Sequence, residues 1–507
     1  MIVKVATGAI IGIESRPVDV EIDVSQGLPQ FSTVGLPDVT VKESKDRVKS
    51  AIKNSGYSFP KHRVTVNLAP AEIRKEGASF DLPIAVGILA AQSIIEKSRL
   101  ANYMIIGELS LDGSIKPVNG ILSAAFQAKQ SGFKGIILPR QNRLEAAMVD
   151  SIDVIAAEYL SDVVDFLNSA REIEPTRIDR ADLFFKSHTY SFDFCEVGGQ
   201  MHTKRALEIA AAGGHNLLMI GPPGSGKTML AQRLVTILPD LSFEEAIETT
   251  KIHSVAGIRE RGSMLMESRP FRAPHHSVSD AGLVGGGHIP RPGEISLAHN
   301  GVLFLDEFPE FKRNVLEVLR QPLEEGAVTI TRAALTARYP ARFMLVAAMN
   351  PCPCGYFTDP QHTCRCTPQQ IRQYRAKISG PLLDRIDIHV EVPSIRYRDL
   401  MTRDSESSKI IKKRVEGARL IQKSRLSGNS KCNAHMTNEE IRTHCRLDEK
   451  SKQLIEMAVD TLGISARAYT KIIKVARTIA DLESEESIES HHVSEAIQYR
   501  NLDRIAI

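Results

Sequence analysis

The 507-residue sequence lacks several features that mark special classes of protein. It has no run of eighteen apolar residues, which argues against a membrane span, and its first residues contain no A-x-A-like cleavage site, which argues against a signal peptide. Trp is absent, and aromatic residues make up only 5%. A net charge of +3 is too small to indicate a nucleic-acid partner by itself, so any such surface must be local. No internal repeat is visible, and this length predicts about three domains.

Cysteine is scarce and unevenly placed. Four of the seven cysteines lie in "MNPCPCGYFTDPQHTCRC" (349–366), which predicts reduced thiols or a metal site in the cytoplasm rather than a disulfide framework. The clustered cysteines are Cys352, Cys354, Cys364 and Cys366. Their C-x-C-x₉-C-x-C spacing suits a structural, tetrahedral Zn²⁺, with His362 as a competing ligand. Free thiols, or a redox or catalytic use, are the alternatives. We expect the scattered cysteines to be simply packed or exposed: Cys195, Cys432 and Cys445.

Residues 1–170 read as a mixed α/β domain. "MIVKVATGAIIGIE" predicts a first strand, and a strictly alternating apolar face predicts a half-buried second strand. That face consists of Val18, Val20, Ile22 and Val24. "HRVTVNL" (62–68) repeats the alternation, "DLPIAVGILAAQ" (81–92) predicts a helix, and "GELSLDGSIKPV" (107–118) predicts a hairpin.

A polar, irregular stretch at 171–194 reads as a linker. Residues 195–395 then alternate buried strands with helical segments, which is typical of a parallel sheet. We expect strands at "HNLLMI" (215–220), "GVLFL" (301–305) and "FMLVAA" (343–348).

Residues 396–507 are charged, poor in strand signals and predicted to form a helical lid. Thr437 and Glu440 in "TNEE" form a capping box, and "TPQQI" from Thr367 predicts another helix start. A helical stripe predicts one buried face, made of Ile472, Val475, Ala476 and Ile479.

"GPPGSGKT" (221–228) fits the phosphate-binding pattern G-x-x-x-x-G-K-[ST] at every fixed position. Backbone N–H groups of such a loop cradle phosphates at a helix N-terminus. Lys227 is expected to reach the β- and γ-phosphates of ATP, and the Thr228 hydroxyl to bind Mg²⁺. The predicted nucleotide-binding loop is Gly221, Pro222, Pro223, Gly224, Ser225, Gly226, Lys227 and Thr228.

Two further predicted strands end in polar residues. Asp306 and Glu307 follow "GVLFL", where Asp306 would hold Mg²⁺ and Glu307 would orient the attacking water. An acidic pair that merely caps the next helix is the alternative. Asn350 follows "FMLVAAM" and could sense the γ-phosphate, although turn chemistry explains many such residues.

Four motifs together resemble the Mg-chelatase-like AAA+ ATPases, and most closely the ComM/YifB family. They are "GPPGSGKT" (221–228), "GVLFLDEF" (301–308), "VAAMNPCPCG" (346–355) and "GPLLDRIDIHVEVP" (380–393). The resemblance extends over essentially the whole chain. It implies an AAA+ P-loop core from 195 to 395 with a cysteine insert at 350–367, a Lon-protease-like N-terminal domain and a helical lid. It also implies a hexameric, ATP-driven ring.

The resemblance carries over three further site residues. Arg385 in "LLDRID" matches the arginine finger that such rings insert into a neighbouring subunit's site. Arg467 in "SARAYTKI" matches the lid arginine called sensor 2, and Gln200 in "VGGQ" matches the segment near the adenine. A structural or surface role is the alternative for each arginine.

The N-terminal segments "RKEGASFDLPIAVG" and "GELSLDGSIKPVNGILSAA" are similar to the Lon protease domain. Ser79 falls at the position of the nucleophile, but Leu122 occupies the position of the lysine that would activate it. We therefore expect a scaffold or ring-forming domain without peptidase activity.

DNA is the expected partner, and its contacts are the least specific prediction. Arginines in two inserts could contact phosphates, namely Arg259, Arg261, Arg332 and Arg338. His275 and His276 read as loop packing or pore residues rather than metal ligands. The basic stretch 409–431 is either a solvated helix face or a nucleic-acid contact. The family implies a DNA-stimulated helicase for branch migration in natural transformation, alongside recombination proteins. A porphyrin metal-insertion motor and a protein-remodelling ATPase are the alternatives.

Overall fold

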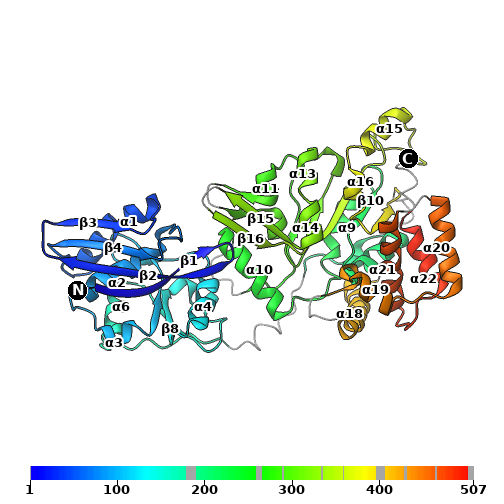
Figure 1. Ribbon diagram of the computed structural model, residues 1–507. Coiled ribbons are helices and arrows are strands. Elements are labelled where there is room, and N and C mark those ends of the chain that lie inside the picture. The colour runs from blue at the N-terminus through cyan, green and yellow to red at the C-terminus, as the bar shows by residue number, and fades with distance from the viewer. Residues whose placement is uncertain are drawn as a thin grey trace. The chain divides into compact units, whose positions relative to one another are not determined.

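The computed structural model divides into two compact units, each described here by itself. The described residues are 2–178, 190–258, 265–287, 290–332, 335–357, 359–394, 406–426, 431–462 and 465–500. Unit 1 comprises Met1–Ser187 and Ala246–Glu267, and unit 2 comprises His188–Glu245 and Ser268–Ile507 (Figure 1). Over these described ranges, the helices are too short or too polar to cross a membrane.

Unit 1 is mixed α/β. Its strands are β1 (Ile2–Ile11), β2 (Glu14–Ser25), β3 (Gln30–Val34), β4 (Arg63–Ala69), β5 (Tyr103–Ile105), β6 (Glu108–Leu109), β7 (Ile115–Lys116), β8 (Gly135–Pro139) and β9 (Asp153–Ala157). Its helices are α1 (Val39–Asn54), α2 (Asp81–Ala91), α3 (Lys97–Leu100), α4 (Ile121–Gln130), α5 (Arg143–Ala146) and α6 (Leu160–Leu167), with 3₁₀ turns η1 (Ala78–Phe80) and η2 (Arg140–Asn142). A four-stranded sheet runs in the order β1-β2-β4-β3, and β5-β8-β9 form a parallel sheet.

The predicted strand alternation is confirmed in β2. Val18, Val20 and Ile22 are almost fully buried, and this face packs against α2 in the core of unit 1. The first strand, the helix α2 and the hairpin β6–β7 also form as predicted. Short-range periodicity was sufficient for β2, which has one buried and one more exposed face, whereas α2 is buried from Asp81 to Ala90 and was indicated by its long apolar run.

Unit 2 contains a parallel sheet, a β-hairpin and a helical lid. Its strands are β10 (Leu217–Ile220), β11 (Phe271–Arg272), β12 (Gly285–Gly286), β13 (Arg291–Pro292), β14 (Val302–Leu305), β15 (Ala327–Arg332), β16 (Leu335–Pro340), β17 (Met344–Met349) and β18 (Ile388–Glu391). The helices before the lid are α8 (Met201–Gly213), α9 (Lys227–Leu234), α11 (Asp280–Val284), α12 (Glu294–Leu297), α13 (Arg313–Glu317), α14 (Arg320–Glu325), α15 (Pro368–Arg375) and α16 (Gly380–Leu383), with η3 (Phe194–Glu196) and η4 (Phe308–Glu310). Helix α10 (Phe243–Ala256) includes the boundary between the units.

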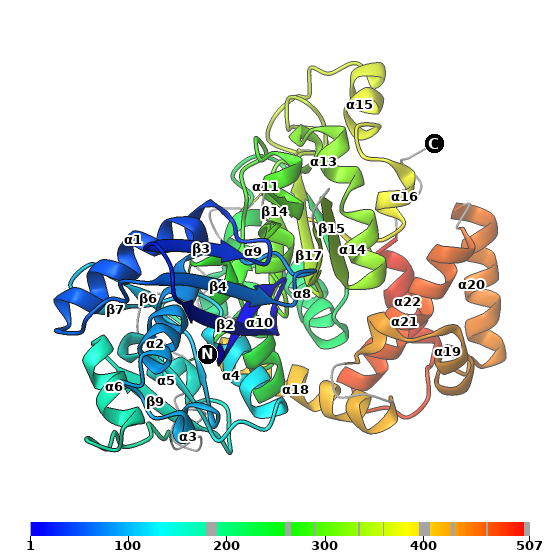
Figure 2. The same ribbon diagram turned by 60° about the vertical axis from the view of Figure 1, so that its left-hand side comes forward.

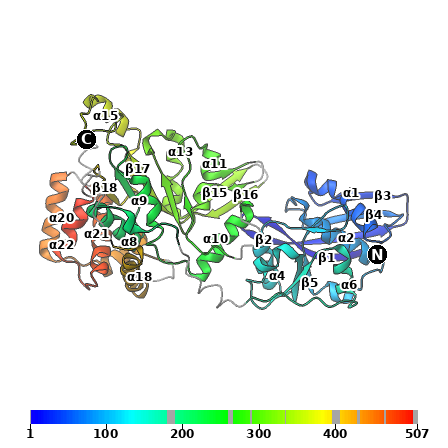
Figure 3. The ribbon, with the colours of Figure 1, turned by 180° about the vertical axis from the view of Figure 1, so that it is seen from behind.

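The central sheet of unit 2 has the strand order β11-β14-β17-β10-β18, and all its pairs are parallel. Helix α8 packs against β18 and α9 against β17, as Figure 3 shows from behind. The register pairs Ile220 with Met349 and Leu305 with Ala347. The residues that follow β10, β14 and β17 therefore meet at one edge of the sheet.

The three strands predicted for this sheet are confirmed as β10, β14 and β17. The domain boundaries drawn from the sequence stay predictions. Residues Ala246–Glu267, which fall inside the expected 195–395 domain, group with unit 1.

The described part of the lid is helical. It consists of α18 (Ser408–Arg425), η5 (Asn433–His435), α19 (Asn438–His444), α20 (Glu449–Leu462), α21 (Ala466–Leu482) and α22 (Ser490–Gln498). Figure 2 shows α19 to α22 grouped together in orange and red, and α18 and α21 pack against α8. The capping box at Thr437 and the buried stripe of α21 are confirmed.

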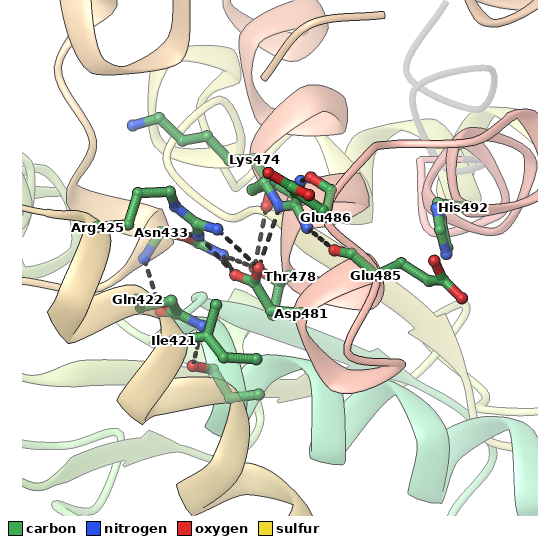
Figure 4. A network of polar contacts seen from close by, with 12 residues as sticks. Ile421, Gln422, Arg425, Asn433, Lys474, Thr478, Asp481, Glu485, Glu486 and His492 are labelled. Atoms are coloured by element: carbon green, nitrogen blue, oxygen red, sulfur yellow. Dashed lines mark hydrogen bonds and ion pairs between the residues drawn. The ribbon is translucent and has the colours of Figure 1, made fainter. Parts of the chain in front are cut away.

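A buried polar network joins α18, η5 and α21 (Figure 4). The fully buried Asp481 carboxylate accepts hydrogen bonds from Arg425 at 2.7 and 2.8 Å, from Arg477 at 3.1 Å and from Asn433 at 2.7 Å. A buried charge is tolerated only when it is paired and hydrogen-bonded in this way. The network therefore fixes how the lid helices pack.

A second polar pair, the buried Cys432 and the exposed His435, lies where η5 meets α8. The Cys432 Sγ is 3.1 Å from the His435 Nδ1, and a Cβ added to Gly214 would lie only 2.5 Å from that sulfur. Burial alone would raise the pKa of the Cys432 thiol, but His435, Arg419 and His215 lower it to about 5. This thiol was expected to be simply packed or exposed, and the spacing of the cysteines gave no sign of its contact with His435.

This pair predicts that Cys432 is a thiolate at neutral pH in the folded protein. Because its pKa is about 5, the NMR shift of its Cβ carbon should titrate near that pH and stay nearly constant above a pH of about 6. Cys445 is an internal control, since burial raises the pKa of its thiol to about 11. Its Cβ carbon should keep the shift of a thiol up to a pH of about 9. Protein labelled with ¹³C at cysteine allows both carbons to be followed, and a Cys432 shift that titrates only above a pH of about 8 would contradict the pair.

Candidate functional site

The predicted phosphate loop joins β10 to α9 at the carboxyl edge of the parallel sheet. Gly226 caps α9 with a left-handed backbone (φ 86°), a conformation that favours glycine. A Cβ added to Gly221 would lie 2.1 Å from the Val392 carbonyl oxygen, so the loop passes close to the chain after β18. The glycines of the motif thus meet local backbone requirements.

Lys227 lies inside this loop, and its side chain is almost fully buried. Its ammonium donates hydrogen bonds to the carbonyls of Gly221 at 2.7 Å and Pro222 at 2.8 Å, and to the Asn350 Oδ1 at 3.3 Å. Burial lowers the pKa of Lys227, an effect that the Asp306 carboxylate opposes. The cation is therefore held at the mouth of the loop, beside the amide that ends β17.

Thr228 and Asp306 are brought together from two strands. The Thr228 hydroxyl donates to the Asp306 Oδ2 at 2.7 Å, and the other carboxylate oxygen accepts from the backbone N–H of Glu307 at 2.9 Å. A hydroxyl and a carboxylate at the start of a helix are hard oxygen donors of the kind that Mg²⁺ prefers. The donor set therefore fits Mg²⁺ bound together with phosphate.

Glu307 has a partner that sequence reasoning missed. Its backbone is left-handed (φ 52°), and its Oε2 lies 3.0 Å from the His276 Nδ1. The rings of His275 and His276 are adjacent and tilted by 35°, with centroids 4.0 Å apart. His276 follows β11, which pairs with β14, so adjacent parallel strands bring it to Glu307. Only the strand order could have revealed this, because about thirty positions separate the two residues.

Gln200 supports the loop from the other side. It has a left-handed backbone (φ 52°) and begins α8, and its side-chain Nε2 donates to the Ser225 carbonyl at 2.7 Å and the Pro393 carbonyl at 3.4 Å. Its side chain therefore connects the phosphate loop to the chain that follows β18. This contact fits a position beside a bound nucleotide.

Arg385 and Arg467 lie together, but apart from the phosphate loop. Both line a cavity of about 820 Å³, whose lining contains no residue of 221–228 among the described residues. The Arg385 guanidinium bonds to Glu324 and the Pro381 carbonyl, whereas Arg467 is 65% exposed with its Nη1 4.0 Å from Asp384. Within one chain, neither arginine shares the site of Lys227.

The remaining described residues that line this cavity come from the chain after α8, from α14 and the glycine after it, from the chain before β17, from the chain between α16 and β18, and from the lid. The cationic ones among them are Arg342, Lys431, Lys471, Lys474 and His435. Lys471 is paired with the buried Asp387 at 2.8 Å, and Lys474 donates to the Ala434 carbonyl. The described lining also contains four carboxylates, those of Glu324, Glu325, Asp384 and Asp387. The positive groups therefore outnumber the negative ones, but several are already paired.

The four clustered cysteines converge at the end of β17. Their sulfurs all lie within 4.8 Å of one another, with Sγ–Sγ distances of 3.3 Å for Cys352–Cys354, 3.7 Å for Cys352–Cys364 and 3.6 Å for Cys354–Cys364. The His362 Nδ1 instead lies 3.6 Å from the Asp359 Oδ2, and its ring packs at a tilt against that of Tyr356. The structure thus favours Cys366 over His362 as the fourth ligand of a metal.

The two described DNA-contact candidates lie on the β15–β16 hairpin but on different faces. Arg338 pairs with Thr329 on the exposed face, whereas a Cβ added to Gly286 would lie 3.2 Å from the Arg332 guanidinium. Arg259 and Arg261 lie outside the described residues. The sequence did not indicate that these two arginines lie on different faces.

The basic stretch 409–431 is largely occupied by contacts within unit 2. In α18, Lys412 pairs with Asp240, Arg414 with Glu208 and Glu406, and Arg419 donates to the Ala211 carbonyl. Arg425 belongs to the buried network of the lid. These contacts favour the structural interpretation of the stretch over the nucleic-acid one.

In unit 1, Ser79 and Leu122 occupy the positions that correspond to the serine and the lysine of the Lon catalytic pair. Ser79 lies in η1 and Leu122 in α4, where the Leu122 side chain is fully buried. A leucine side chain has no group that could accept a proton from a serine hydroxyl. The expectation of a domain without peptidase activity therefore stays a prediction with a chemical reason.

Family models and known proteins match this chain closely. The model described as "Magnesium chelatase, subunit ChlI" matches residues 193–400, "Subunit ChlI of Mg-chelatase" matches 20–142, and "Magnesium chelatase, subunit ChlI C-terminal" matches 405–500. The chain is similar to competence protein ComM of Haemophilus influenzae, 46% identical over 500 residues, which cover 98% of this chain and 97% of that protein.

Two other relatives bear on the fold. YifB of Escherichia coli is 45% identical over 508 residues, which cover 99% of this chain and 98% of that protein. Lon protease 2 of Bacillus subtilis is 30% identical over 142 residues, which cover 27% of this chain and 25% of that protein. The first likeness extends over the whole chain, and the second is local.

Proposed function

Because the chain belongs to the ComM/YifB family of Mg-chelatase-like AAA+ ATPases, we propose that it is a ring-forming ATPase that moves along or remodels DNA. One observation carries the ATPase part: Thr228 contacts Asp306 at 2.7 Å in the same site where Lys227 contacts Asn350. A phosphate loop, a metal-binding pair and a polar group for the γ-phosphate thus come from three parallel strands. This set suits phosphoryl transfer from ATP.

The residues of the site have distinct tasks in this proposal. Mg²⁺, held by Thr228 and Asp306, would neutralise charge on the β- and γ-phosphates. Lys227 exchanges its contacts with loop carbonyls for contacts with phosphate oxygens. The Glu307 carboxylate, turning from His276, orients the attacking water and accepts its proton.

Replacing Glu307 by Gln should separate ATP binding from hydrolysis. The amide keeps the shape of the side chain but cannot accept the proton, so turnover should fall at least about 100-fold. Affinity for ATP, measured with a fluorescent analogue, should stay within about threefold of the wild type. Glu310→Gln is the matched control, since Glu310 is exposed in η4 and pairs with Lys377. Normal turnover in the Glu307 variant would show that another group activates the water.

The cavity that contains Arg385 and Arg467 supports a ring rather than a monomer. Guanidinium groups stabilise the transition state of phosphoryl transfer only when they approach the γ-phosphate closely. Since this cavity is separate from the chain's own phosphate loop, we infer that both arginines act on the nucleotide of a neighbouring copy. A closed hexamer is the arrangement that the family implies.

Mixing two inactive variants tests this arrangement. Lys227→Ala chains still provide Arg385, and Arg385→Ala chains still provide a phosphate loop. Mixed rings should therefore recover part of the ATPase activity that each variant lacks alone. The double variant, which carries both changes in one chain, is the control and should recover nothing with Lys227→Ala. Failure of the two single variants to complement at every ratio, in rings of normal size, would contradict the proposal.

DNA is the proposed substrate of the motor. The β15–β16 hairpin presents exposed hydroxyl and guanidinium groups on one face, which suits contacts with a phosphate backbone. The exposed side chains of that face are Thr329, Thr331, Thr336 and Arg338. The name of the Haemophilus relative, a competence protein, points the same way. We propose branch migration of recombination intermediates during uptake of foreign DNA as the specific activity, alongside recombination proteins.

DNA should increase the ATPase rate, and forked or branched DNA should be compared with single strands and duplexes. Arg338→Ala should weaken DNA binding and reduce the slope of log affinity against log salt by about 1, as expected for a lost phosphate contact. Arg442→Ala, at an exposed position of α19, is the control and should change neither quantity. An ATPase that no DNA structure stimulates would favour a metal-insertion or protein-remodelling motor.

We also propose Zn²⁺ at the cysteine cluster. Four thiolates about 2.3 Å from a tetrahedral Zn²⁺ stand about 3.8 Å from one another. The Sγ–Sγ distances of 3.3 to 3.7 Å need only small adjustments to reach this geometry. Four protein ligands leave no position for a reacting water, so this ion would be structural.

A further inference from the structure

The turn that carries the first two cysteines of the cluster lies against the phosphate loop. Gly355 follows Cys354 in a tight turn closed by a 3.0 Å hydrogen bond from its N–H to the Cys352 carbonyl. Its backbone is left-handed (φ 87°), and a Cβ added there would lie 2.6 and 2.8 Å from two ring carbons of Pro223. Pro223 is the third residue of the phosphate loop. The turn that carries two of the four cysteines therefore packs against the phosphate loop.

A second connection runs through the start of the cluster. Asn350, whose side chain contacts Lys227, is two residues before Cys352. A Cβ added to Gly355 would also lie 3.9 Å from the Asn350 Cγ. The first pair of cysteines is thus bounded by two residues of the nucleotide site. A shift of this turn would move both of them.

The other pair of cysteines is anchored on a different element. Cys366 is followed at once by Thr367, whose capping box starts α15. Arg375, at the end of α15, donates to the Pro351 carbonyl at 3.1 and 3.2 Å. Helix α15 and the turn beside the phosphate loop are therefore joined at one end by Arg375 and at the other by the four sulfurs.

We propose that the metal held by Cys352, Cys354, Cys364 and Cys366 positions the phosphate loop, so that nucleotide binding depends on metal occupancy. This inference rests on the nucleotide site of the proposed function. Metal–thiolate bonds cross-link the turn at 352–355 to the chain at 364–366, about ten residues later. With the cross-link in place, Gly355 and Asn350 are held against Pro223 and Lys227. When the metal is removed, the turn at 352–355 is no longer cross-linked, and the phosphate loop is no longer packed against a rigid neighbour.

Two substitutions distinguish the effect of the metal from the effect of the contact between Gly355 and Pro223. Cys364→Ser removes one ligand from the half of the cluster that lies away from the phosphate loop. Gly355→Ala keeps all four cysteines but pushes a methyl group into Pro223. Cys195→Ser is the control for the first, since Cys195 is exposed and outside the cluster. Gly132→Ala is the control for the second, because Gly132 has a left-handed backbone (φ 76°) with no atom within 4 Å of an added Cβ.

Zinc content by elemental analysis and affinity for a fluorescent ATP analogue are measured on the full-length chain. The wild type and both controls should carry about one zinc per chain and bind the analogue equally. Cys364→Ser should lose the metal and bind the analogue at least about tenfold more weakly. Gly355→Ala should keep the metal and also bind at least several-fold more weakly.

The outcomes discriminate between the possible failures. Cys364→Ser protein that is free of zinc but binds nucleotide like the wild type would overturn the inference alone. If that variant does not fold, Gly355→Ala decides, since full zinc with unchanged affinity would overturn the inference equally. A wild type that carries zinc but binds no nucleotide would overturn the proposed function and this inference together. A wild type that binds nucleotide but contains no zinc would overturn this inference and the proposed zinc site, while the proposed ATPase function would stand.

Discussion

The parallel pairing of β10, β14 and β17 is the constraint on which the candidate site depends. Asp306 is seventy-eight positions from Thr228, and Asn350 is one hundred and twenty-three from Lys227, yet each pair is in contact. Such contacts arise because the carboxyl ends of parallel strands meet at one edge and ligands bind there. Any slip in the register of β14 against β17 would move Asp306 away from the hydroxyl of Thr228. The chemistry is thus a consequence of the sheet order.

The parts of the site that were predicted from sequence are those with local signals. The phosphate loop can be located within a few residues because a glycine-rich motif lies between a strand and a helix. The acidic residues can be located in the same way because they follow a buried strand. His276 has no such signal, because its contact with Glu307 depends on which strand lies beside β14. Cys432 and His435 are close in the sequence, but their environment depends on the burial of Cys432 against the end of α8. Tertiary packing, rather than residue type, determines these two contacts.

The arginines show the same limit in a different form. Motif resemblance identified Arg385 and Arg467, but only the structure brings them into one cavity away from Lys227. For α18, composition left two interpretations open, and the contacts with Asp240, Glu208 and Asp481 favour the structural one. A basic composition states how much charge is present. It does not state which of those charges have partners within the same unit.

The environment of Arg385 explains how one chain could keep this residue ready for a neighbour. The side chain is only 11% exposed, and its Nε is buried without a hydrogen-bond acceptor among the described residues. Leaving a buried donor unsatisfied is unfavourable, so an additional acceptor would be stabilising there. Its present partner, Glu324, is 56% exposed, and a solvated ion pair of this kind contributes little. A phosphate group carries more charge and more acceptors than a carboxylate. On the proposed function, a neighbour's triphosphate would therefore compete well for this guanidinium, which Glu324 and the Pro381 carbonyl hold in position beforehand.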